Sequence, residues 1–213
     1  MILSGRGRIV WRDAATVVLH APAEHLATIV GPFRWTSLAS VLNELDAAVE
    51  VVTREEEFAG AGPLPAGWIA EPALVYQEPA AIPRPACSWP VTLFTAADTP
   101  DLRHVPTALR HELEAARAFS PIAAAFDGDV PVSFCYAGWA TEQWWDVSID
   151  TLAPWRTRGF AAAATAGLMT HMRDVGKRAV WAALESNVAS LAVARRLEFE
   201  PVGRLAVVRR RSG

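Results

Sequence analysis

The chain has 213 residues, of which 52% are hydrophobic and 20% are charged, and its net charge at pH 7 is -3. This composition is typical of a globular protein with a hydrophobic core, and the slightly acidic balance argues against a general nucleic-acid binder. No apolar run approaches the ~20 residues of a membrane span, and charges stand where a signal peptide needs an apolar segment. We therefore expect a cytoplasmic protein with no nucleic-acid or membrane partner.

The cysteines and histidines do not indicate a metal site. Cys87 and Cys135 are too few for a disulfide framework or a four-thiolate zinc site. His104 and His111 share one face of a predicted helix, but no third ligand stands at a convincing spacing. We expect reduced thiols and no metal.

Residues 1–78 are predicted to form a smaller α/β region of open role. We expect a strand over 8–20, helices near 23–30 and 36–52, an acidic loop over 54–68 and a strand over 68–76. Residues 79–90 hold four prolines and indicate a stiff connector, because such a segment cannot be a helix or an inner strand. The first region could be a degenerate copy of the second, but no repeated motif supports this.

Residues 91–213 show a sharper pattern. A short strand over 91–96 and a helix over 102–119 come first, and Asp127-Gly128-Asp129 then separates two apolar runs, which indicates a β-hairpin. A strand over 144–152, a helix over 159–175, a strand over 178–184, a helix over 190–199 and a strand over 202–210 follow. The order β-β-β-α-β-α-β predicts a sheet that begins antiparallel and acquires a parallel crossover.

The stretch APWRTRGFAAAATAG, residues 153–167, predicts an anion site at the start of a helix. Helix N-termini favour acidic side chains, because the unpaired N–H groups there carry partial positive charge. Here Arg156 and Arg158 stand instead, and no acidic residue follows until Asp174. Gly159 would let a phosphate approach the backbone where a Cβ would block it. An acidic first turn would compete with such a ligand, so its absence favours a phosphate site.

These residues resemble the GCN5-related N-acetyltransferase (GNAT) family. The segment Arg156-Thr157-Arg158-Gly159-Phe160-Ala161 matches the family signature (Gln/Arg)-x-x-Gly-x-(Gly/Ala). Asn187 and Ser190 stand where the family has an Asn-x-x-(Ala/Ser) stretch before its last helix. The resemblance covers residues 91–210. It implies an α/β (α+β) fold, with a mixed, mostly antiparallel central sheet, a splayed parallel pair and flanking helices.

The resemblance also implies acetyl-CoA as co-substrate, bound between strands 144–152 and 178–184. The pantetheine arm would pair with the strand end and with Asn187, the pyrophosphate would sit on the amides of the loop, and Ser190 would support the phosphate side. Both arginines could instead be solvated, and Asn187 with Ser190 could also cap a helix. The implied binding residues are Asp150, Thr151, Leu152, Arg156, Thr157, Arg158, Gly159, Phe160, Ala161, Asn187 and Ser190.

Acetyl transfer to an amine also needs a general base. Asp146 is the expected base, because it stands six residues before Leu152, where some histone-acetylating members of the family carry a glutamate. Asp150 and Glu185 are the reserve candidates. Asp146 and Asp150 could equally be solvated strand carboxylates.

The proton donor for the leaving thiolate departs from the family pattern. Ala194 stands where many members have a tyrosine, and Glu198 stands where a glycine usually precedes the final phenylalanine. Tyr136 is the expected substitute, with Cys135 or a water molecule as alternatives. Tyr136 could also simply be packed in the sheet.

The sequence therefore predicts an acyl-CoA-dependent N-acyltransferase, with acetyl-CoA as the expected donor and direct transfer to a small-molecule or peptide amine. The alternative is a degenerate GNAT fold that binds CoA as a sensor or scaffold without transferase activity, which Ala194 and Glu198 favour. A nucleotide-binding protein is less favoured, because no Walker-type Gly-Lys-Ser/Thr follows the loop. A homodimer is compatible with the sequence.

Overall fold

The computed structural model describes residues 7–83 and 88–211. The chain divides into two compact units: unit 1 is Met1–Val75, Ala183–Ser186 and Gly203–Gly213, and unit 2 is Tyr76–Ala182 and Asn187–Val202. Residues 84–87 of the expected connector, including Cys87, lie outside the described residues. The division into regions 1–78, 79–90 and 91–213 stays a prediction.

Unit 1 contains strands from both ends of the chain, in the order β1-β2-β3-β4-β11. β1 (Arg8–Arg12), β2 (Val17–Ala21) and β3 (Leu26–Val30) are antiparallel neighbours. The helix α1 (Trp35–Glu44) leads to β4 (Glu50–Arg54), which runs parallel to β3. The last strand, β11 (Glu200–Arg210), pairs antiparallel with β4. Helix α2 (Glu55–Gly60) precedes β5 (Trp68–Gln77).

Two expectations for the N-terminal region are wrong, for local reasons. The strand expected over 8–20 is a hairpin, because Asp13 Oδ1 accepts hydrogen bonds from the N–H groups of Ala15 and Thr16 and turns the chain. The helix expected near 23–30 is strand β3. Its sequence, LATIV, is rich in β-branched residues and alternates between buried and less buried positions.

Two boundaries in the same region also differ from the prediction. The helix expected over 36–52 ends at Glu44, because Asp46 accepts the N–H groups of Ala48 and Val49 in a tight turn. The acidic loop begins with α2, whose first turn is three glutamates. Acidic side chains stabilise the first turn of a helix through its dipole.

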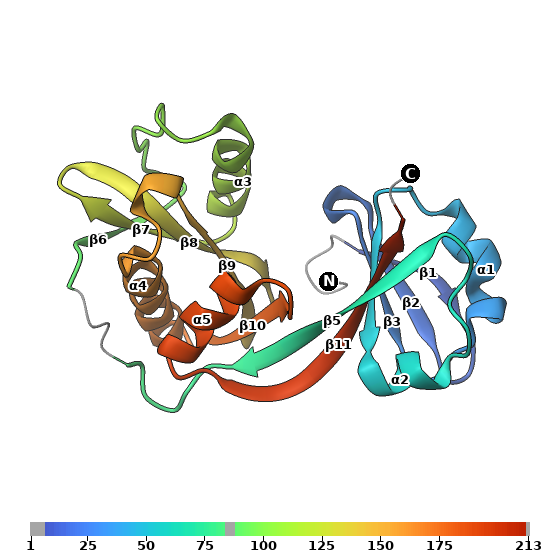
Figure 1. The fold of residues 1–213 in the computed structure, drawn as a ribbon. Helices are drawn as coiled ribbons and strands as arrows, with labels where there is room; N and C mark the ends of the chain where they lie inside the picture. The colour runs from blue at the N-terminus through green and yellow to red at the C-terminus, as the bar shows by residue number, and fades with distance from the viewer. Residues whose placement is uncertain (1–6, 84–87, 212–213) are drawn as a thin grey trace. The chain divides into compact units, whose positions relative to one another are not determined.

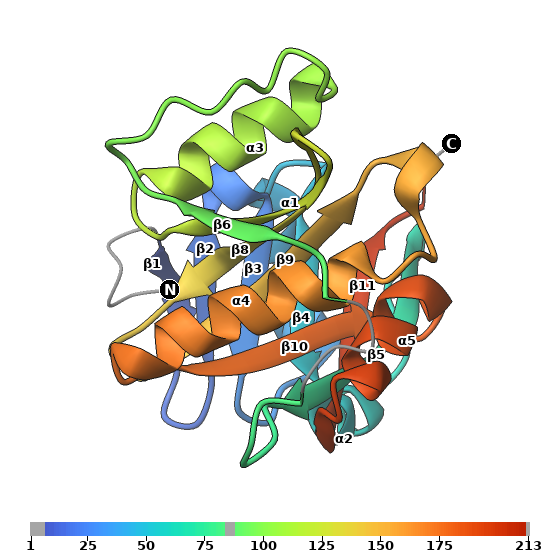
Figure 2. The same ribbon diagram turned by 90° about the vertical axis from the view of Figure 1, so that its left-hand side faces the viewer.

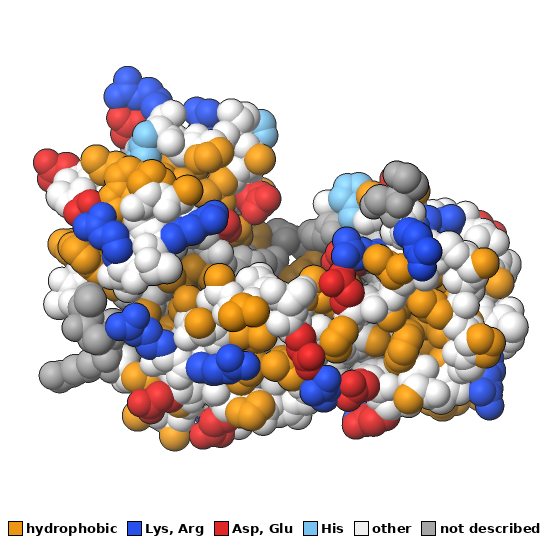
Figure 3. Space-filling view, in the orientation of Figure 1, with side chains coloured by type: hydrophobic (Ala, Val, Ile, Leu, Met, Phe, Trp, Pro, Cys, Tyr) orange, Lys and Arg blue, Asp and Glu red, His pale blue; other side chains and the backbone are white. Residues whose placement is uncertain are grey.

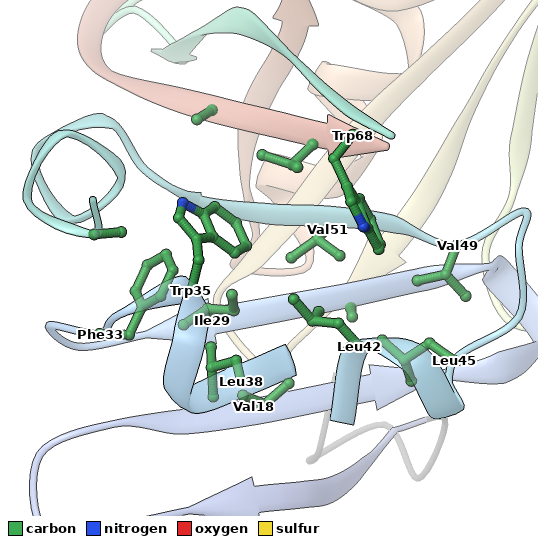
Figure 4. Packing of buried hydrophobic residues seen from close by; sticks show 14 residues of the cluster. Val18, Ile29, Phe33, Trp35, Leu38, Leu42, Leu45, Val49, Val51 and Trp68 are labelled. Carbon is green, nitrogen blue, oxygen red and sulfur yellow. The ribbon is translucent and has the colours of Figure 1, made fainter. Parts of the chain in front are cut away.

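The core of unit 1 lies between α1 and the sheet (Figure 4). Trp35, Leu38 and Leu42 recur at positions i, i+3 and i+7 and are at most 2% exposed. This spacing puts them on one helix face, which packs on the strands that carry Ile29 and Val51.

Unit 2 has the strand order β6-β7-β8-β9-β10. β6 (Val91–Phe94), β7 (Ile122–Asp127), β8 (Val130–Ala140) and β9 (Trp144–Thr151) are antiparallel neighbours. β10 (Arg178–Leu184) runs parallel to β9 after helix α4 (Phe160–Asp174), and α5 (Val188–Arg196) follows β10. Helices α3 (Thr107–Arg117) and α4 pack on opposite faces of the sheet (Figures 1 and 2). The predicted mixed, mostly antiparallel sheet is confirmed. None of the described helices combines the length and apolar character needed to cross a membrane.

The two units repeat one element order. β1-β2-β3-α1-β4-α2-β5 and β7-β8-β9-α4-β10-α5-β11 both read β-β-β-α-β-α-β, and each copy forms a parallel pair across its first helix. The last strand of the second copy, β11, pairs with β4 of the first. The two series therefore share one element order, and unit 1 includes the last strand of the second series.

A buried carboxylate, Glu78, anchors the start of the connector segment in unit 2. Glu78 is 1% exposed, and it accepts hydrogen bonds from Arg173 Nε at 2.7 Å and from the Ala179 N–H at 2.6 Å. Arg178 Nε lies 3.6 Å from Glu78 Oε1. Arg173 also donates to the carbonyl of Pro79. The buried charge is thus paired and hydrogen-bonded.

The substitution Glu78→Gln is expected to lower the free energy of unfolding by about 3 kcal/mol, because removing one partner of a buried ion pair leaves the other charge uncompensated. Urea unfolding followed by circular dichroism measures this. The control is Glu185→Gln, which removes an exposed ion pair with Arg204 and should cost less than about 1 kcal/mol. Equal, small losses for both variants would contradict the anchoring role.

Candidate functional site

Strands β9 and β10 form a fork. Their parallel register runs from Arg178↔Trp144 to Val180↔Asp146, and no further pair of these strands follows among the described residues, although β9 continues to Thr151. Beyond Asp146, the edge of β9 that faces β10 therefore has no strand pairing with β10. The splayed parallel pair expected from the sequence is present.

The fork-facing edge of β9 offers peptide groups at a two-residue spacing. The Leu152 N–H donates to the Val132 carbonyl of β8 at 2.9 Å, so this residue faces away from the fork. Successive residues of a strand alternate, and the groups of Val147, Ile149 and Thr151 face the other side. Arg156 Nε donates to the Thr151 carbonyl there at 3.0 Å. An extended polar ligand could pair with this edge.

Asp146 lies at the apex of the fork. Its carboxylate accepts hydrogen bonds from the N–H groups of Val147 on β9 and Ala182 on β10. Burial raises the pKa of Asp146 to about 7, and the two N–H donors limit the rise. A carboxyl group with a pKa near 7 can take up a proton at neutral pH, which is what a general base requires.

Gly138 keeps space beside Asp146, and sequence reasoning missed it. The β8–β9 register shifts between Ala137 and Ala140, and Gly138 lies in this bulge. A Cβ on Gly138 would stand 2.8 Å from Ser148 Oγ and 3.3 Å from Asp146 Oδ2, which is too close for a side chain without displacement. A glycine inside a strand often marks a bulge or a close approach, and that was the available signal.

The Tyr136 hydroxyl lies between two carboxylates. Its oxygen is 2.9 Å from Glu112 Oε2 and 3.0 Å from Asp150 Oδ2. Burial, together with these negative charges, raises the pKa of Tyr136 far above its ordinary value. Burial also raises the pKa of Asp150; the charge of Glu112 adds to this, and Tyr136 and Arg156 oppose it. The phenol is therefore a weak acid, and its single O–H group donates to a carboxylate. The assignment of Tyr136 as proton donor to the leaving thiolate stays a prediction.

Cys135 lies on the opposite face of the sheet from Tyr136. It is fully buried, it hydrogen-bonds Thr165 of α4, and burial raises the pKa of its thiol to about 12. Its burial on the α4 face argues against the alternative that Cys135 protonates the leaving group.

The loop before α4 ends in an open helix N-terminus. Thr157 and Gly159 have positive φ angles of 62° and 91°. Gly159 is the residue before the helix, and it has no side chain with which to cap it. The first helical hydrogen bond comes from the Ala163 N–H to the Gly159 carbonyl, so the N–H groups of residues 160–162 precede the helical ladder. Such groups, with no acidic residue in the first turn, are able to bind an anion.

The two loop arginines have different surroundings. Arg156 donates to the end of β9, as described above. The Arg158 guanidinium lies 3.3 Å from Asp127 Oδ2 and 5.2 Å from the centre of the Phe160 ring. Arg158 is thus engaged in an ion pair and a cation–π contact, and a phosphate role for it stays a prediction.

Trp89, at the end of the proline-rich segment, braces this loop, and no sequence motif indicates this role. Its ring stacks on Phe160 with the centres 4.1 Å apart, and its Nε1–H donates to the Arg158 carbonyl at 3.0 Å. The Arg158 guanidinium lies over the same ring at 5.7 Å. These contacts fix the backbone on the N-terminal side of α4.

The substitution Trp89→Leu is expected to weaken binding of an anionic ligand at this loop by about tenfold, because a stacked aromatic pair and a hydrogen bond each contribute about 1 kcal/mol. Calorimetric titration of CoA measures this. Trp89→Phe keeps a ring but loses the N–H donor, so it should fall between the wild type and the leucine variant. Wild-type affinity in the leucine variant would contradict the bracing role.

Asn187 and Ser190 meet at the start of α5. Asn187 Oδ1 accepts the Ser190 N–H at 3.1 Å, and Ser190 Oγ accepts Trp181 Nε1–H at 2.9 Å. Both residues therefore contribute to a helix cap, whatever else they bind. Ala194 is fully buried. Glu198 has a φ of 56°, a conformation that favours glycine.

Among residues 7–83 and 88–211, no group of three or more His, Cys, Asp or Glu side chains could hold a metal ion. The reserve base Glu185 belongs to unit 1, where it pairs with Arg204 at 2.6 Å.

The strand order, the fork after Asp146 and the glycine-led helix are those of the GCN5-related N-acetyltransferases, and the chain has this fold. No protein-family model matches the sequence, and no curated protein matches it.

Solved structures share the fold at low sequence identity. A GCN5-related N-acetyltransferase from Kribbella flavida is 17% identical, with a TM-score of 0.68 over 99% of this chain and 92% of that chain. A putative GNAT-family acetyltransferase from Novosphingobium aromaticivorans is 14% identical, with a TM-score of 0.65 over 96% and 92%. A tandem GNAT protein from the clavulanic acid biosynthesis pathway is 13% identical, with a TM-score of 0.55 over 95% and 82%.

Proposed function

We propose that the chain is an acyl-CoA-dependent N-acyltransferase that transfers an acetyl group from acetyl-CoA to an amine. The observation that carries this proposal is the open helix N-terminus behind Gly159, which stands at the end of a forked parallel pair. An anion site next to an unpaired strand edge fits a ligand with phosphates at one end and an extended amide-containing arm. The named GNAT neighbours support the same reading.

In this proposal, the pyrophosphate of acetyl-CoA binds the N–H groups of residues 160–162. The pantetheine amides pair with the fork-facing peptide groups of Ile149 and with the N–H group of Thr151, whose carbonyl accepts Arg156. The thioester then comes close to the apex of the fork and Asp146. Arg156, which is already held at the strand end, supplies positive charge beside the phosphates.

The chemistry assigned to Asp146 is proton transfer. The carboxylate removes a proton from the acceptor ammonium, and the neutral amine attacks the thioester carbonyl. The C–N bond forms, the C–S bond breaks, and CoA leaves as a thiolate. The amine nitrogen loses its second proton to water, and protonated Asp146 gives its proton to the sulfur. A thiolate is a good leaving group because the pKa of a thiol is only about 8.5, so transfer does not require a tyrosine at Ala194.

Unit 1 is not expected to bind a second acetyl-CoA. At the matching junction before α1, the Gly31 N–H donates to Glu57 Oε1 at 3.1 Å and the Trp35 N–H donates to the Ala61 carbonyl at 3.2 Å. A carboxylate and a carbonyl thus occupy donors that a phosphate would use, so one donor molecule per chain is expected.

The test combines calorimetry with a thiol-release assay. Acetyl-CoA is titrated into the full chain, and CoA release is then followed with a panel of small amines and peptides. Binding of one equivalent and amine-dependent release, with acetylated product seen by mass spectrometry, would support the proposal. Binding without release for any acceptor would favour the alternative, a CoA-binding sensor or scaffold. No binding would contradict both.

A further inference from the structure

We propose that unit 2 holds a second ligand site, separate from the fork, for a small molecule with an apolar body and one carboxylate group. A pocket of about 300 Å³ lies between α3, the loop that precedes it and strands β6, β7 and β8. This volume is at the lower end of the range for small-molecule sites. The proposal does not depend on the acyltransferase function.

The floor of the pocket is apolar and belongs to a packed cluster. Phe94 of β6 and Leu102 of the loop before α3 are partly exposed and form its surface, and they pack against Leu113, Ile122 and Phe134, which are at most 2% exposed. These side chains are held by the core between α3 and the sheet, so the floor is formed before a ligand arrives. Such a surface takes a small aliphatic or aromatic group.

The rim of the pocket is positively charged. Arg110 and Arg117 stand seven residues apart on α3, which puts them on the same helix face, and both are half-buried. Arg103 completes the basic lining, but it is bound to Asp101 by two side-chain hydrogen bonds of 2.9 and 2.6 Å. With Glu114 included, the lining side chains carry one net positive charge, which a monoanion would balance. Figure 3 shows basic side chains over the loop before α3, with acidic side chains beside them.

Among the described residues, neither Arg110 nor Arg117 forms a direct ion pair with a carboxylate, although the charge of Arg117 contributes to lowering the pKa of Asp98. Arg110 donates to Thr107 Oγ1 at 3.2 Å, and Arg117 donates to the backbone carbonyl of Asp98. The nearby Asp98 carboxylate is bound by the N–H and hydroxyl groups of Thr95. Each guanidinium has five N–H donors in a planar fork that fits a carboxylate, so both can bind a ligand.

The pocket is distinct from the fork. Its lining shares no residue with the loop before α4 or with β9. On α3, Glu112 is connected to β9 by hydrogen bonds, because the Tyr136 hydroxyl contacts both Glu112 and Asp150. The α3 residues that line the pocket are Arg110, Leu113, Glu114 and Arg117. Acetyl-CoA and the carboxylate ligand would therefore bind independently.

The test uses the full chain with 4-phenylbutyrate and its uncharged analogue 4-phenylbutyramide. Saturable binding of the acid is expected, with the amide at least about ten times weaker, because only the acid forms charge-assisted hydrogen bonds with the arginines. Amide resonances that shift in NMR spectra should belong to the pocket lining. The double variant Arg110→Gln/Arg117→Gln should weaken binding of the acid by about tenfold or more, and Arg54→Gln, an exposed arginine of unit 1, should leave it unchanged.

Equal binding of the acid and the amide would overturn the carboxylate assignment. This comparison of the two ligands requires only the wild-type protein. Unchanged binding of the acid by a folded double variant, or resonance shifts confined to other parts of the chain, would overturn the location. Absence of saturation up to about 20 mM would overturn the site itself, since a specific small-molecule site with two guanidinium contacts should bind more tightly.

Discussion

The substitution Gly159→Glu is expected to weaken acetyl-CoA binding by at least about 100-fold, because a carboxylate at the helix N-terminus competes with the phosphates for the N–H groups of residues 160–162. The new side chain also brings a Cβ to a position with a φ of 91°, where the ligand would approach the backbone. Calorimetric titration of acetyl-CoA measures the loss.

Gly176→Glu is the matched control for this variant. Gly176 follows the same helix at its other end, has a φ of 79°, and a Cβ there would meet nothing within 4 Å. The control adds the same charge and a similar backbone strain, but it leaves the N-terminus of α4 open. Binding should stay within about threefold of the wild type, a change of less than 1 kcal/mol. Equal losses in both variants would mean that strain in α4, and not the anion site, controls binding.

The substitution Asp146→Asn is expected to lower kcat/KM for acetyl transfer by about 100-fold or more, the range that general-base catalysis supplies. The wild-type rate should rise with pH through about 7, because the carboxyl group acts as a base only after it loses its proton. The asparagine variant should lose this rise. A steady-state pH profile with a fixed amine measures both effects.

The same substitution is expected to stabilise the protein at pH 8. The folded-state pKa of Asp146, about 7, exceeds the value of an exposed aspartate, so the folded protein holds the proton more tightly than the unfolded chain does. Stability from this group is therefore present at low pH and is lost as the pH rises from about 4 to about 7. Asparagine has no charge to bury, and its amide oxygen can still accept an N–H bond. The free energy of unfolding at pH 8 should rise by about 1 to 3 kcal/mol.

Asp174→Asn, at the end of α4, serves as the control for both measurements and should change neither activity nor stability appreciably. A loss of activity together with a loss of stability in Asp146→Asn would indicate a structural role. Retained activity with an unchanged pH profile would exclude Asp146 as the base.

The elements of unit 2 could be predicted because their signals are local. The alternation from Trp144 to Leu152, the turn at Gly128 and the alanine-rich helix behind Gly159 each occupy one short window. The fold of unit 2 and the loop before α4 could be predicted from these short segments together with the family signature. In unit 1, the same kind of reasoning failed over residues 23–30, where the sheet neighbours of β3 decide its conformation.

The contacts that give the site its properties could not be predicted, because they join distant residues. Trp89 meets the loop about 70 positions later, and the Ala182 N–H meets Asp146 across the fork. The hydrogen bond between the Tyr136 hydroxyl and Glu112 depends on the position of α3 in the fold. A hydrophobic pattern indicates which face of an element is buried, but it does not indicate which side chain lies opposite.

The pairing of β11 with β4 has a consequence for synthesis on the ribosome. Leu205 to Val208 follow their partners Val51 to Arg54 by about 150 positions, so β4 emerges about 10 s or more before its neighbour exists. During that interval β4 is an open strand edge, which is prone to pair with other chains. Unit 1 thus begins to be translated first but is completed last. A mutation in residues 203–210 that prevents β11 from pairing would leave the sheet of unit 1, in the N-terminal half of the chain, incomplete.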